Sequence, residues 1–559
     1  MSAVETPRPA DVLRIEGLTV GLAGRRGATE PIVNRISLHV GDGEMVCVVG
    51  ESGSGKSVTS LAVMGLLPPS LAVTDGHIRL EGEDLTSAGS GRIRALRASR
   101  MAMIFQEPMT ALNPVMTVGS QIEEVLKAHG RSNPRQRRAR TLAMLEQVHL
   151  PDVQRIYASY PHQLSGGQRQ RIMIAMALVL RPKLLIADEP TTALDVTTQK
   201  QILKLIKELQ EETGTAVLFI THDMGVVAEI ADRVYVMSNG RFVEDGRLEQ
   251  ILEAPRQGYT RRLLASVPSL VPRPTRPATD PRIALETTEL TKLYSRRMWL
   301  RRAETTVAAA DVSISLKRGR TLGIVGESGS GKSTVARCIM RLTDPTSGSI
   351  RINGKEIADL SRRTLQPHRK RIQMIFQDPY RSLNPRLRVA DSITEGPINF
   401  GTPAAAALAH AAELLELVGL PADAAGRFPH QLSGGQRQRV AIARALAMDP
   451  DVLVADEAVS ALDVSVQAQV IKLLEDVQLQ LGIALLFITH DLRVAARICD
   501  EVAVMQRGHV VEYGEAADVL TKPRHAYTRQ LLDAAPGRYW DFANFAPLKP
   551  VAEAAAAPN

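Results

Sequence analysis

The sequence predicts an α/β protein built from two tandem domains that share one plan. The letters Gly-Glu-Ser-Gly-Ser-Gly-Lys-Ser occur at residues 50–57 and return at residues 326–333. Each copy follows an apolar run typical of a buried strand and precedes a stretch typical of a helix. Lys56 corresponds to Lys332, 276 residues later, and His222 to His490, 268 residues later. The distance between corresponding residues thus falls from 276 to 268 positions along the chain. This pattern indicates duplicated domains with small insertions or deletions near their start.

The repeat sets the predicted domain boundaries. The two units span residues 12–267 and 283–535. Residues 268–282 lie between them and contain five prolines, which predicts a stiff, extended linker. Residues 536–559 are rich in Ala and Pro and are predicted to form a tail.

Composition limits the class of protein. Hydrophobic residues make up 44% of the 559 residues, yet no run approaches the roughly eighteen apolar residues that cross a bilayer. The polar N-terminus does not resemble a signal peptide. The three cysteines lie far apart, which predicts buried thiols. The net charge is +8, but aromatic residues are only 4%, which disfavours a base-stacking surface. We therefore predict a cytosolic protein and expect no nucleic acid as partner.

The elements of the first unit are predicted in order. Residues 12–22 and 31–40 are expected to be strands of an N-terminal sheet, and residues 90–160 a helical subdomain. The runs 183–189 and 215–220 are apolar and end in polar residues, as buried parallel strands do when ligands bind at their carboxyl ends. Residues 233–243 have Asn-Gly in the middle, which predicts a hairpin.

The eight repeated letters fit the pattern of a phosphate-binding loop. The glycines allow successive backbone N–H groups to point at one anion, at the start of the following helix. The lysine adds a positive charge for the outer phosphates, and the final serine can ligate Mg²⁺. The candidate ligands are Gly50, Ser52, Gly53, Gly55, Lys56 and Ser57, and in the second unit Gly326, Ser328, Gly329, Gly331, Lys332 and Ser333.

An acidic pair ends an apolar strand in each unit. The pairs are Asp188-Glu189 and Asp456-Glu457. The Asp is placed to hold Mg²⁺, directly or through water, and the Glu is placed to take a proton from an attacking water. The alternative, an exposed acidic turn, is disfavoured because both pairs follow a phosphate loop at a matching distance.

The letters Leu-Ser-Gly-Gly-Gln at residues 164–168 and 432–436 open an arginine-containing helix in each unit. Ser and two glycines at a helix start form either a further anion site or a plain helix cap. With these segments, the chain resembles the ABC ATPase family, whose signature sequence is LSGGQ, over nearly all of both units. The resemblance implies two tandem ABC ATPase domains, each with a RecA-like α/β core, an N-terminal antiparallel β subdomain and a helical subdomain. It also implies ATP and Mg²⁺ as ligands.

In this family, two such domains close head to tail around two ATP molecules, and each site joins the phosphate loop of one domain to the signature of the other. Carried over, one site combines Lys56, Ser57, Gln106, Asp188, Glu189 and His222 with Ser433, Gly434 and Gly435. The other combines Lys332, Ser333, Gln377, Asp456, Glu457 and His490 with Ser165, Gly166 and Gly167. The resemblance implies that the histidines contact the γ-phosphate. It implies that the glutamines sense the metal and a transmembrane partner.

Two departures from the family pattern matter. The family usually stacks adenine on an aromatic residue before the phosphate loop. The second unit offers Tyr294, whereas the first has Leu22 near the matching place, which predicts weaker ATP binding there. The second unit also has Ala458 where the first has Pro190. Because the preceding Glu is kept in both units, we predict two hydrolytic sites.

The segments after the two glutamines, Glu-Pro-Met-Thr-Ala-Leu-Asn-Pro and Asp-Pro-Tyr-Arg-Ser-Leu-Asn-Pro, resemble the oligopeptide, dipeptide and nickel importer branch. So do the Tyr-Thr-Arg-x-Leu-Leu segments at residues 259–264 and 527–532. This resemblance implies the energy-coupling subunit of a peptide importer. Its partners would be two transmembrane permease subunits and, through them, an extracytoplasmic substrate-binding protein. The chain would be peripheral, on the cytoplasmic face of the cell inner membrane.

A second interpretation is a two-domain ABC ATPase that acts on ribosomes. Such proteins carry a long, charged helical linker, whereas residues 268–282 are short and rich in proline, so the importer is favoured.

Two arginine-rich segments are harder to interpret. Residues 295–302 have apolar residues between pairs of arginines, which suits contact with lipid headgroups or a permease. A solvated insertion explains the same residues equally well. The five arginines between residues 131 and 140 are predicted to form a solvated helix face.

Overall fold

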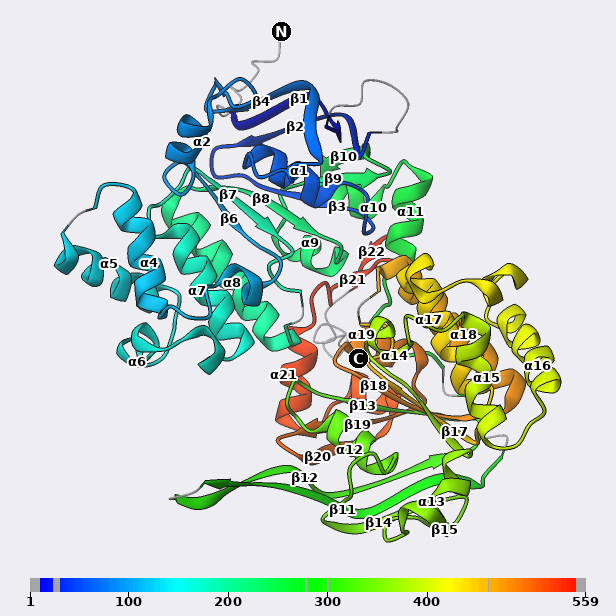
Figure 1. Cartoon of the computed structure of the whole chain (residues 1–559). Coiled ribbons are helices and arrows are strands. Elements are labelled where there is room, and N and C mark those ends of the chain that lie inside the picture. Colours follow the sequence, from blue (N-terminus) through cyan, green and yellow to red (C-terminus); the bar gives the residue numbers. More distant parts are fainter. Residues whose placement is uncertain are drawn as a thin grey trace, which may run out of the picture. The chain divides into compact units, whose positions relative to one another are not determined.

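The computed structural model describes residues 11–23, 31–131, 133–192, 194–274, 276, 280–298, 301–460 and 462–548. The chain divides into two compact units. One contains Met1–Leu194, Thr198–Ala265 and Tyr539–Asn559, and the other Asp195–Thr197 and Ser266–Arg538. Each unit has an antiparallel four-stranded sheet and a six-stranded mixed sheet with helices (Figure 1), which confirms the predicted fold class.

In the first unit, the antiparallel sheet has the order β2-β1-β4-β5 and the larger sheet the order β10-β9-β3-β8-β7-β6. All neighbours in the larger sheet are parallel except β9 and β10. The strands are β1 (Asp11–Leu22), β2 (Val33–Gly41), β3 (Met45–Val49), β4 (Leu71–Leu80), β5 (Glu83–Asp84), β6 (Met101–Ile104), β7 (Leu184–Asp188), β8 (Ala216–Thr221), β9 (Arg233–Ser238) and β10 (Arg241–Arg247).

The hairpin between β9 and β10 turns at Asn239 and Gly240, both with positive φ, as the Asn-Gly pair predicts. The helices of this unit are α1 (Lys56–Val63), α2 (Ser90–Leu96), α3 (Pro108–Ala111), α4 (Val118–Ala128), α5 (Pro134–Gln147), α6 (Val153–Ala158), α7 (Gly166–Leu178), α8 (Val196–Thr213), α9 (Met224–Ile230), α10 (Leu248–Glu253) and α11 (Gly258–Ala265).

The predicted helical stretch from residue 90 to 160 is interrupted by strand β6. Its four residues are all buried and pair in parallel with β7, at the edge of the core sheet. Four apolar residues are too few to show a period of two or of 3.6, so only the pairing partner identifies this segment as a strand.

The prediction that the arginines between residues 131 and 140 form a solvated face is wrong for Arg137 and Arg140, which are partly buried, whereas Arg138 is exposed. The Arg137 Nε lies 3.6 Å from Glu123 Oε2, and the Arg138 guanidinium lies 4.8 Å from the centre of the Tyr157 ring. Arg140 Nε donates a hydrogen bond to the Val179 carbonyl at 2.9 Å. Long arginine stems can cover apolar surface while their ends find partners, and the letters alone do not show this.

The second unit repeats the plan, with sheet orders β12-β11-β14-β15 and β16-β17-β18-β13-β19-β20. Its strands are β11 (Ile283–Met298), β12 (Arg301–Lys317), β13 (Thr321–Val325), β14 (Ser347–Ile352), β15 (Lys355–Glu356), β16 (Ile372–Ile375), β17 (Val452–Asp456), β18 (Ala484–Thr489), β19 (Glu501–Gln506) and β20 (His509–Glu515). The helices are α12 (Lys332–Ile339), α13 (Arg362–Arg369), α14 (Pro379–Ser382), α15 (Val389–Asn399), α16 (Ala404–Leu417), α17 (Gly434–Leu446), α18 (Val464–Leu481), α19 (Leu492–Ile498), α20 (Ala516–Thr521) and α21 (Ala526–Ala534). The short hairpin of β21 (Trp540–Asp541) and β22 (Ala546–Pro547) comes next in the chain and belongs to the first unit.

Some predicted segments fall outside the described residues. The arginine-rich segment 295–302 lies at the end of the β11–β12 hairpin, and its side chains from residue 296 on are not among those described. The last eleven residues of the predicted tail also lie outside the described residues.

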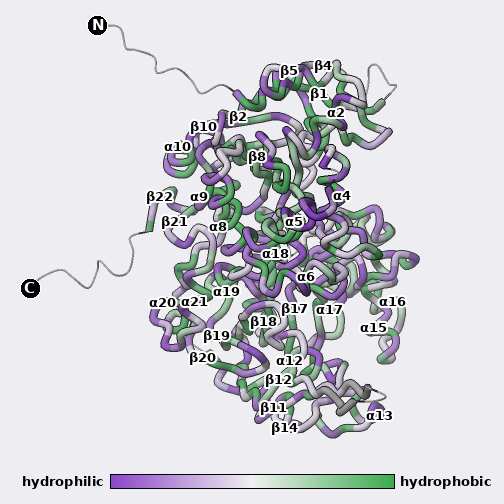
Figure 2. The backbone as a smooth tube through the Cα atoms, turned by 90° about the vertical axis from the view of Figure 1, so that its left-hand side faces the viewer, coloured by the Kyte–Doolittle hydropathy of each residue, from purple (hydrophilic) through white to green (hydrophobic). Residues whose placement is uncertain are grey.

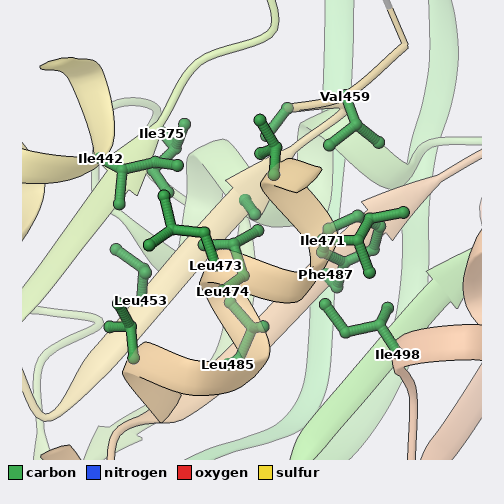
Figure 3. Close-up of a cluster of buried hydrophobic side chains, with 14 of the residues drawn as sticks. Ile375, Ile442, Leu453, Val459, Ile471, Leu473, Leu474, Leu485, Phe487 and Ile498 are labelled. Atoms are coloured by element: carbon green, nitrogen blue, oxygen red, sulfur yellow. The ribbon is translucent and has the colours of Figure 1, made fainter. Parts of the chain in front are cut away.

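The six-stranded sheet of the second unit separates two apolar cores. Leu453 and Ala455 of β17 face one core, whereas Val452 and Val454 of the same strand face the other. Figure 3 shows the first of these cores, where Leu473 and Leu474 of α18 lie against Leu453, Leu485 and Phe487 of the strands. Both faces of the sheet are therefore buried, which explains why these strands are continuous apolar runs without alternation.

The start of the predicted linker is fixed to the second unit. Arg273 Nη2 and Arg276 Nη2 lie 2.8 Å and 3.0 Å from the two carboxylate oxygens of Asp500, whose side chain is fully buried. Asp500 also accepts a hydrogen bond from the Thr321 N–H at 2.8 Å. A buried carboxylate needs such partners, so these contacts tie the proline-rich segment to the start of β13.

Among the described residues, no helix combines the length and apolar character needed to cross a membrane. Figure 2 shows apolar and polar residues interspersed along the chain.

Candidate nucleotide sites

The first phosphate loop connects β3 to α1, as predicted. Gly50 and Gly55 both have positive φ, of 154° and 107°. A Cβ atom at Gly50 would lie 2.1 Å from the Met237 carbonyl oxygen, so only glycine fits there. The Lys56 side chain is buried, and its Nζ donates hydrogen bonds to the carbonyls of Gly50 at 2.7 Å and Glu51 at 2.8 Å. The ammonium group thus lies inside the curl of the loop.

The second loop, between β13 and α12, has the same geometry. A Cβ at Gly326 would lie 2.3 Å from the Met505 carbonyl oxygen. Lys332 Nζ donates to the Gly326 and Glu327 carbonyls at 2.8 Å and 2.7 Å. Burial lowers the pKa of Lys332. The helix α12 begins directly after the loop, so its free N–H groups face the place where phosphate would lie.

Strand β7 brings the acidic pair of the first unit to the phosphate loop. Ser57 Oγ donates a hydrogen bond to Asp188 Oδ1 at 3.1 Å. Gln106 Nε2 donates to Glu189 Oε2 at 3.0 Å, and His222 Nδ1 lies 3.1 Å from Glu189 Oε1. The structure therefore brings together five of the six residues that the sequence placed in this half of a site, and the sixth, Lys56, lies in the loop itself.

Thr192 also contacts this cluster, and the sequence analysis did not identify it. Its hydroxyl donates to Glu189 Oε2 at 3.0 Å. The second unit has Ser460 at the corresponding place, where the hydroxyl instead donates to the Glu457 carbonyl at 2.9 Å. The sequence could have indicated this residue, because a residue with a hydroxyl lies three positions after the Glu in both units.

The corresponding cluster of the second unit is built in the same way. Ser333 Oγ donates to Asp456 Oδ1 at 3.1 Å. Gln377 Nε2 donates to Glu457 Oε2 at 2.6 Å, and His490 Nδ1 lies 3.5 Å from Glu457 Oε1. The two units therefore share the hydrogen bonds around the acidic pair as well as the sequence motifs.

Glu189 and Glu457 also share an unusual backbone. Their φ angles are +46° and +47°, in the left-handed region that disfavours side chains larger than glycine. Such a conformation costs on the order of 1 kcal/mol or more and occurs preferentially at functional sites. The backbone N–H of Glu189 donates to the Ile220 carbonyl and that of Glu457 to the Ile488 carbonyl, both at 2.9 Å, which holds each residue in place.

The two carboxyls of each pair differ in proton affinity. Burial, with the neighbouring charge of Glu189, raises the pKa of Asp188 to about 6. Burial opposes ionisation of Glu189 as well, but the hydrogen bond and charge of His222 outweigh it and lower the Glu189 pKa. The same contact raises the pKa of His222 against the effect of its own burial. Glu189 therefore stays ionised beside a histidine, as a proton acceptor requires.

We expect Asp188→Asn to stabilise the nucleotide-free chain at neutral pH. A pKa that rises from 3.8 in the unfolded chain to about 6 in the folded chain means that the folded state loses stability between about pH 4 and pH 6. At pH 7 the free energy of unfolding is lower by on the order of 2 to 3 kcal/mol for this reason. Asn does not ionise, so the variant avoids this loss. Denaturant midpoints measured from pH 4 to pH 8 test this, with the exposed Asp42→Asn as matched control. A constant difference between Asp188→Asn and the parent across this range would contradict the prediction.

The signature segments lie at the start of α7 and α17. Ser165 Oγ accepts a hydrogen bond from the Gln168 N–H at 3.3 Å, and Gln168 Oε1 accepts from the Ser165 N–H at 3.0 Å, so both residues cap the helix. A Cβ at Gly167 would lie 2.7 Å from Thr198 Cγ2, which requires glycine for packing. A Cβ at Gly434 would meet nothing within 4 Å. The first glycine of the signature is thus open to a ligand, whereas the second serves packing.

The residues that sequence analysis assigned to the adenine base are both accessible. Leu22 ends β1 and is 39% exposed, and Tyr294 lies in β11 and is 44% exposed. Lys292 Nζ lies 5.1 Å from the centre of the Tyr294 ring, which leaves the other ring face for a base.

We expect the site of the second phosphate loop to bind ATP more tightly than that of the first. Stacking of a base on an aromatic ring contributes about 1 kcal/mol or more, which is about fivefold in affinity. Tyr294→Leu should remove this difference and Leu22→Tyr should reduce it. The affinity of each site is measured in chains whose other site carries a Lys→Ala change. Equal affinities of the two sites in the parent chain would contradict the expectation.

Asp188 and Ser57 present the oxygen ligands that Mg²⁺ prefers, at the mouth of the phosphate loop. The Gln106 amide nitrogen is directed at Glu189, so its carbonyl oxygen is the group left for a metal. Within the described ranges, no group of three or more His, Cys, Asp or Glu side chains could hold a metal ion by itself. The oxygens of Ser57 and Asp188 fit Mg²⁺, which typically binds one or two protein oxygens together with phosphate and water.

Comparison with known proteins identifies the family of this chain. The family described as "ABC transporter" matches residues 33–192 and 309–460, and the family "Oligopeptide/dipeptide transporter, C-terminal region" matches residues 243–303 and 511–540. The glutathione import ATP-binding protein GsiA is 48% identical in both Salmonella choleraesuis and Escherichia coli O157:H7. In both cases the alignment covers 94% of this chain and 90% of the relative.

Two solved structures each match less than half of this chain. A dimeric ATP-binding cassette in a post-hydrolysis state, bound to ADP and Pi, is 28% identical over 42% of this chain and 98% of its own, with a TM-score of 0.38. The cbiO1 protein of Clostridium perfringens is 30% identical over 45% of this chain and 94% of its own, also with a TM-score of 0.38.

Proposed function

Because the chain belongs to the ABC transporter family, as an ATP-binding protein with two ABC domains and two oligopeptide-type C-terminal regions, we propose that it is the energy-coupling subunit of a peptide importer. The observation that carries this proposal is that each domain joins its Ser to its Asp, and its Gln and His to its Glu, next to a phosphate loop with a buried lysine. Each domain also has such a C-terminal region. The tripeptide glutathione is the first cargo to test, because the relatives at 48% identity are glutathione import proteins.

In the proposed reaction, ATP is hydrolysed to ADP and phosphate. Glu189 and Glu457 take a proton from the attacking water, and their low pKa keeps them ionised for this role. His222 and His490 hold these carboxylates and face the γ-phosphate. Lys56 and Lys332 bind the outer phosphates from inside each loop.

Magnesium is proposed to bind at Ser57 and Asp188, and at Ser333 and Asp456, with Gln106 and Gln377 completing the sets. When bound, it supplies positive charge against the phosphate oxygens. Asp188 must release its proton to act as a ligand, and its raised pKa makes this step sensitive to pH.

We propose that hydrolysis takes place at two composite sites. The glycine that is open at the start of each signature helix, such as Gly434, would approach the ATP bound by the other domain. ATP would bind the closed arrangement of the domains better than the open one, and this difference in affinity would shift the chain toward closure.

In each unit, a groove lined in part by the segment that follows Gln106 or Gln377 offers a place for one permease subunit. In the second unit it has a volume of about 720 Å³ and is lined by Phe376, Gln377, Arg381, Glu395, Arg444 and Met448, among others. In the first unit a groove of about 410 Å³ is lined by Arg97, Asn113, Met116, Gln121, Glu124 and His129, among others. We propose that cytoplasmic segments of the permease bind in these grooves, so the chain would lie on the cytoplasmic face of the inner membrane.

Purification from native membranes tests this function. We expect the chain to co-purify with two hydrophobic permease chains. In liposomes that contain this complex, the binding protein loaded with glutathione or a dipeptide should stimulate ATP hydrolysis. Co-sedimentation with ribosomes and absence from membranes would contradict the importer and support the ribosome-associated alternative. Stimulation by a cargo other than peptides would contradict the proposed cargo alone.

A further inference from the structure

A tyrosine from the C-terminal region of each unit contacts the backbone of the phosphate loop. Tyr259 Oη accepts a hydrogen bond from the Glu51 N–H at 3.3 Å, and Tyr527 Oη accepts one from the Glu327 N–H at 3.2 Å. Glu51 and Glu327 are the second residues of the two loops. Both tyrosines lie outside the segments that match the ABC transporter family and inside those that match the oligopeptide-type C-terminal region.

A glutamate on the neighbouring hairpin fixes the helix that carries each tyrosine. Glu244 of β10 accepts hydrogen bonds from the N–H groups of Arg256 at 2.6 Å and Gln257 at 3.0 Å, directly before α11. Glu512 of β20 accepts from those of Arg524 at 2.7 Å and His525 at 3.2 Å, before α21. The helix that carries the tyrosine is therefore held by the edge hairpin of the six-stranded sheet of its own unit.

The same hairpin also holds the far side of the phosphate loop. The Gly240 N–H donates to the Ser54 carbonyl at 2.9 Å, and the Gly508 N–H donates to the Ser330 carbonyl at 2.9 Å. Each loop is thus gripped at its second and fifth residues, on either side of the segment whose N–H groups face the phosphates.

The hydroxyl of Tyr527 can serve two contacts at once. The side chain is 4% exposed, and burial, with the carboxylate of Glu327, raises its pKa to about 12. It therefore keeps its proton at neutral pH, so the oxygen accepts from the Glu327 N–H while the O–H remains a donor for that carboxylate.

We propose that Tyr259 and Tyr527 are positioning residues of the two ATP sites, which hold the phosphate loops in the conformation that binds phosphate. A loop with three glycines has many accessible conformations, and fixing one of them before ATP arrives lowers the entropic cost of binding. The oligopeptide-type C-terminal region is then a working part of the nucleotide site. This inference rests on the proposed use of these loops as ATP sites.

Tyr527→Phe tests the inference, because it removes only the hydroxyl. It is made in a chain that also carries Lys56→Ala, so that ATP binding reports the second loop. We expect the dissociation constant for ATP to rise about threefold to tenfold, as for the loss of one hydrogen bond. In an otherwise unchanged chain, the double variant Tyr259→Phe/Tyr527→Phe should raise the KM for ATP with little change in kcat, which a merely structural role would not do.

Tyrosines of the same units that bind elsewhere supply matched controls. The Tyr513 hydroxyl lies 2.6 Å from Glu501 Oε2, and the Tyr235 hydroxyl accepts from the His39 N–H at 3.4 Å. Tyr513→Phe and Tyr235→Phe should leave ATP affinity unchanged.

Two outcomes would overturn the inference: an unchanged ATP affinity in Tyr527→Phe, or an equal loss in Tyr513→Phe. If Tyr527→Phe does not fold, Tyr259→Phe and Tyr235→Phe in a Lys332→Ala chain give the same comparison for the first loop. Failure of the parent chain to bind ATP would instead contradict the proposed function.

Discussion

A chain with both Glu189→Gln and Glu457→Gln is expected to hydrolyse ATP about 10²–10⁴-fold more slowly than the parent, the range for loss of a general base. Gln has nearly the same shape as Glu but cannot take a proton from water. Each Glu is held by a histidine and a glutamine, and its pKa is low, so the parent keeps the base ionised. Phosphate release at saturating ATP measures the effect, and ATP binding should persist because the phosphate loops are unchanged.

The matched control is Glu211→Gln/Glu416→Gln, which removes two exposed carboxylates from the same two units and should leave turnover unchanged. The single variant Glu457→Gln addresses whether the second pair is active despite Ala458 in place of proline. We expect it to lower turnover strongly. Near-normal turnover in this variant would count against Glu457 as a base, and near-normal turnover in the double variant would count against both.

Lys56→Ala/Lys332→Ala is expected to weaken ATP binding about 10-fold to 150-fold at each site. Each lysine is buried inside its loop, and hydrogen bonds to a charged group contribute about 1.5–3 kcal/mol. The change removes the charge that faces the outer phosphates and leaves the carbonyls of Gly50, Glu51, Gly326 and Glu327 without these donors. Calorimetric titration with ATP measures the loss.

The control for this variant is Lys204→Ala/Lys355→Ala, because both of these lysines are exposed and distant in sequence from the loops. We expect it to bind ATP like the parent. ATP affinity retained in Lys56→Ala/Lys332→Ala would show that the loops do not bind the phosphates. A large loss of affinity in the control would show that overall charge, and not the buried ammonium, controls binding.

The two phosphate sites share their chemistry but differ at the base. Leu22 and Tyr294 both lie at accessible positions, so the proposed contacts with phosphate are duplicated whereas the proposed contact with adenine is not. Among the described contacts, the Glu-centred hydrogen bonds also differ, since Thr192 donates to the Glu189 carboxylate whereas Ser460 donates to the Glu457 carbonyl. The difference between the domains therefore lies in binding and positioning groups, and the groups proposed for proton transfer are the same.

The sequence by itself determined the fold class, the duplication and the residues that meet around each phosphate loop. These features depend on short motifs at strand ends, and the carboxyl ends of parallel strands meet at one edge of a sheet, so Ser57, Asp188 and Glu189 had to lie close together. Buried strands can also be recognised in the sequence as continuous apolar runs, because both faces of the sheet are covered.

Only the tertiary structure decided the remaining features. Strand β6 is recognisable by its pairing with β7, and the positive φ of Glu189 and Glu457 appears only in the folded backbone. The contacts of Tyr259 with Glu51 and of Arg273 with Asp500 join residues that are more than 200 positions apart. Such contacts follow from how elements pack, and burial then sets proton affinities such as that of Asp188, so neither is encoded in a local pattern of letters.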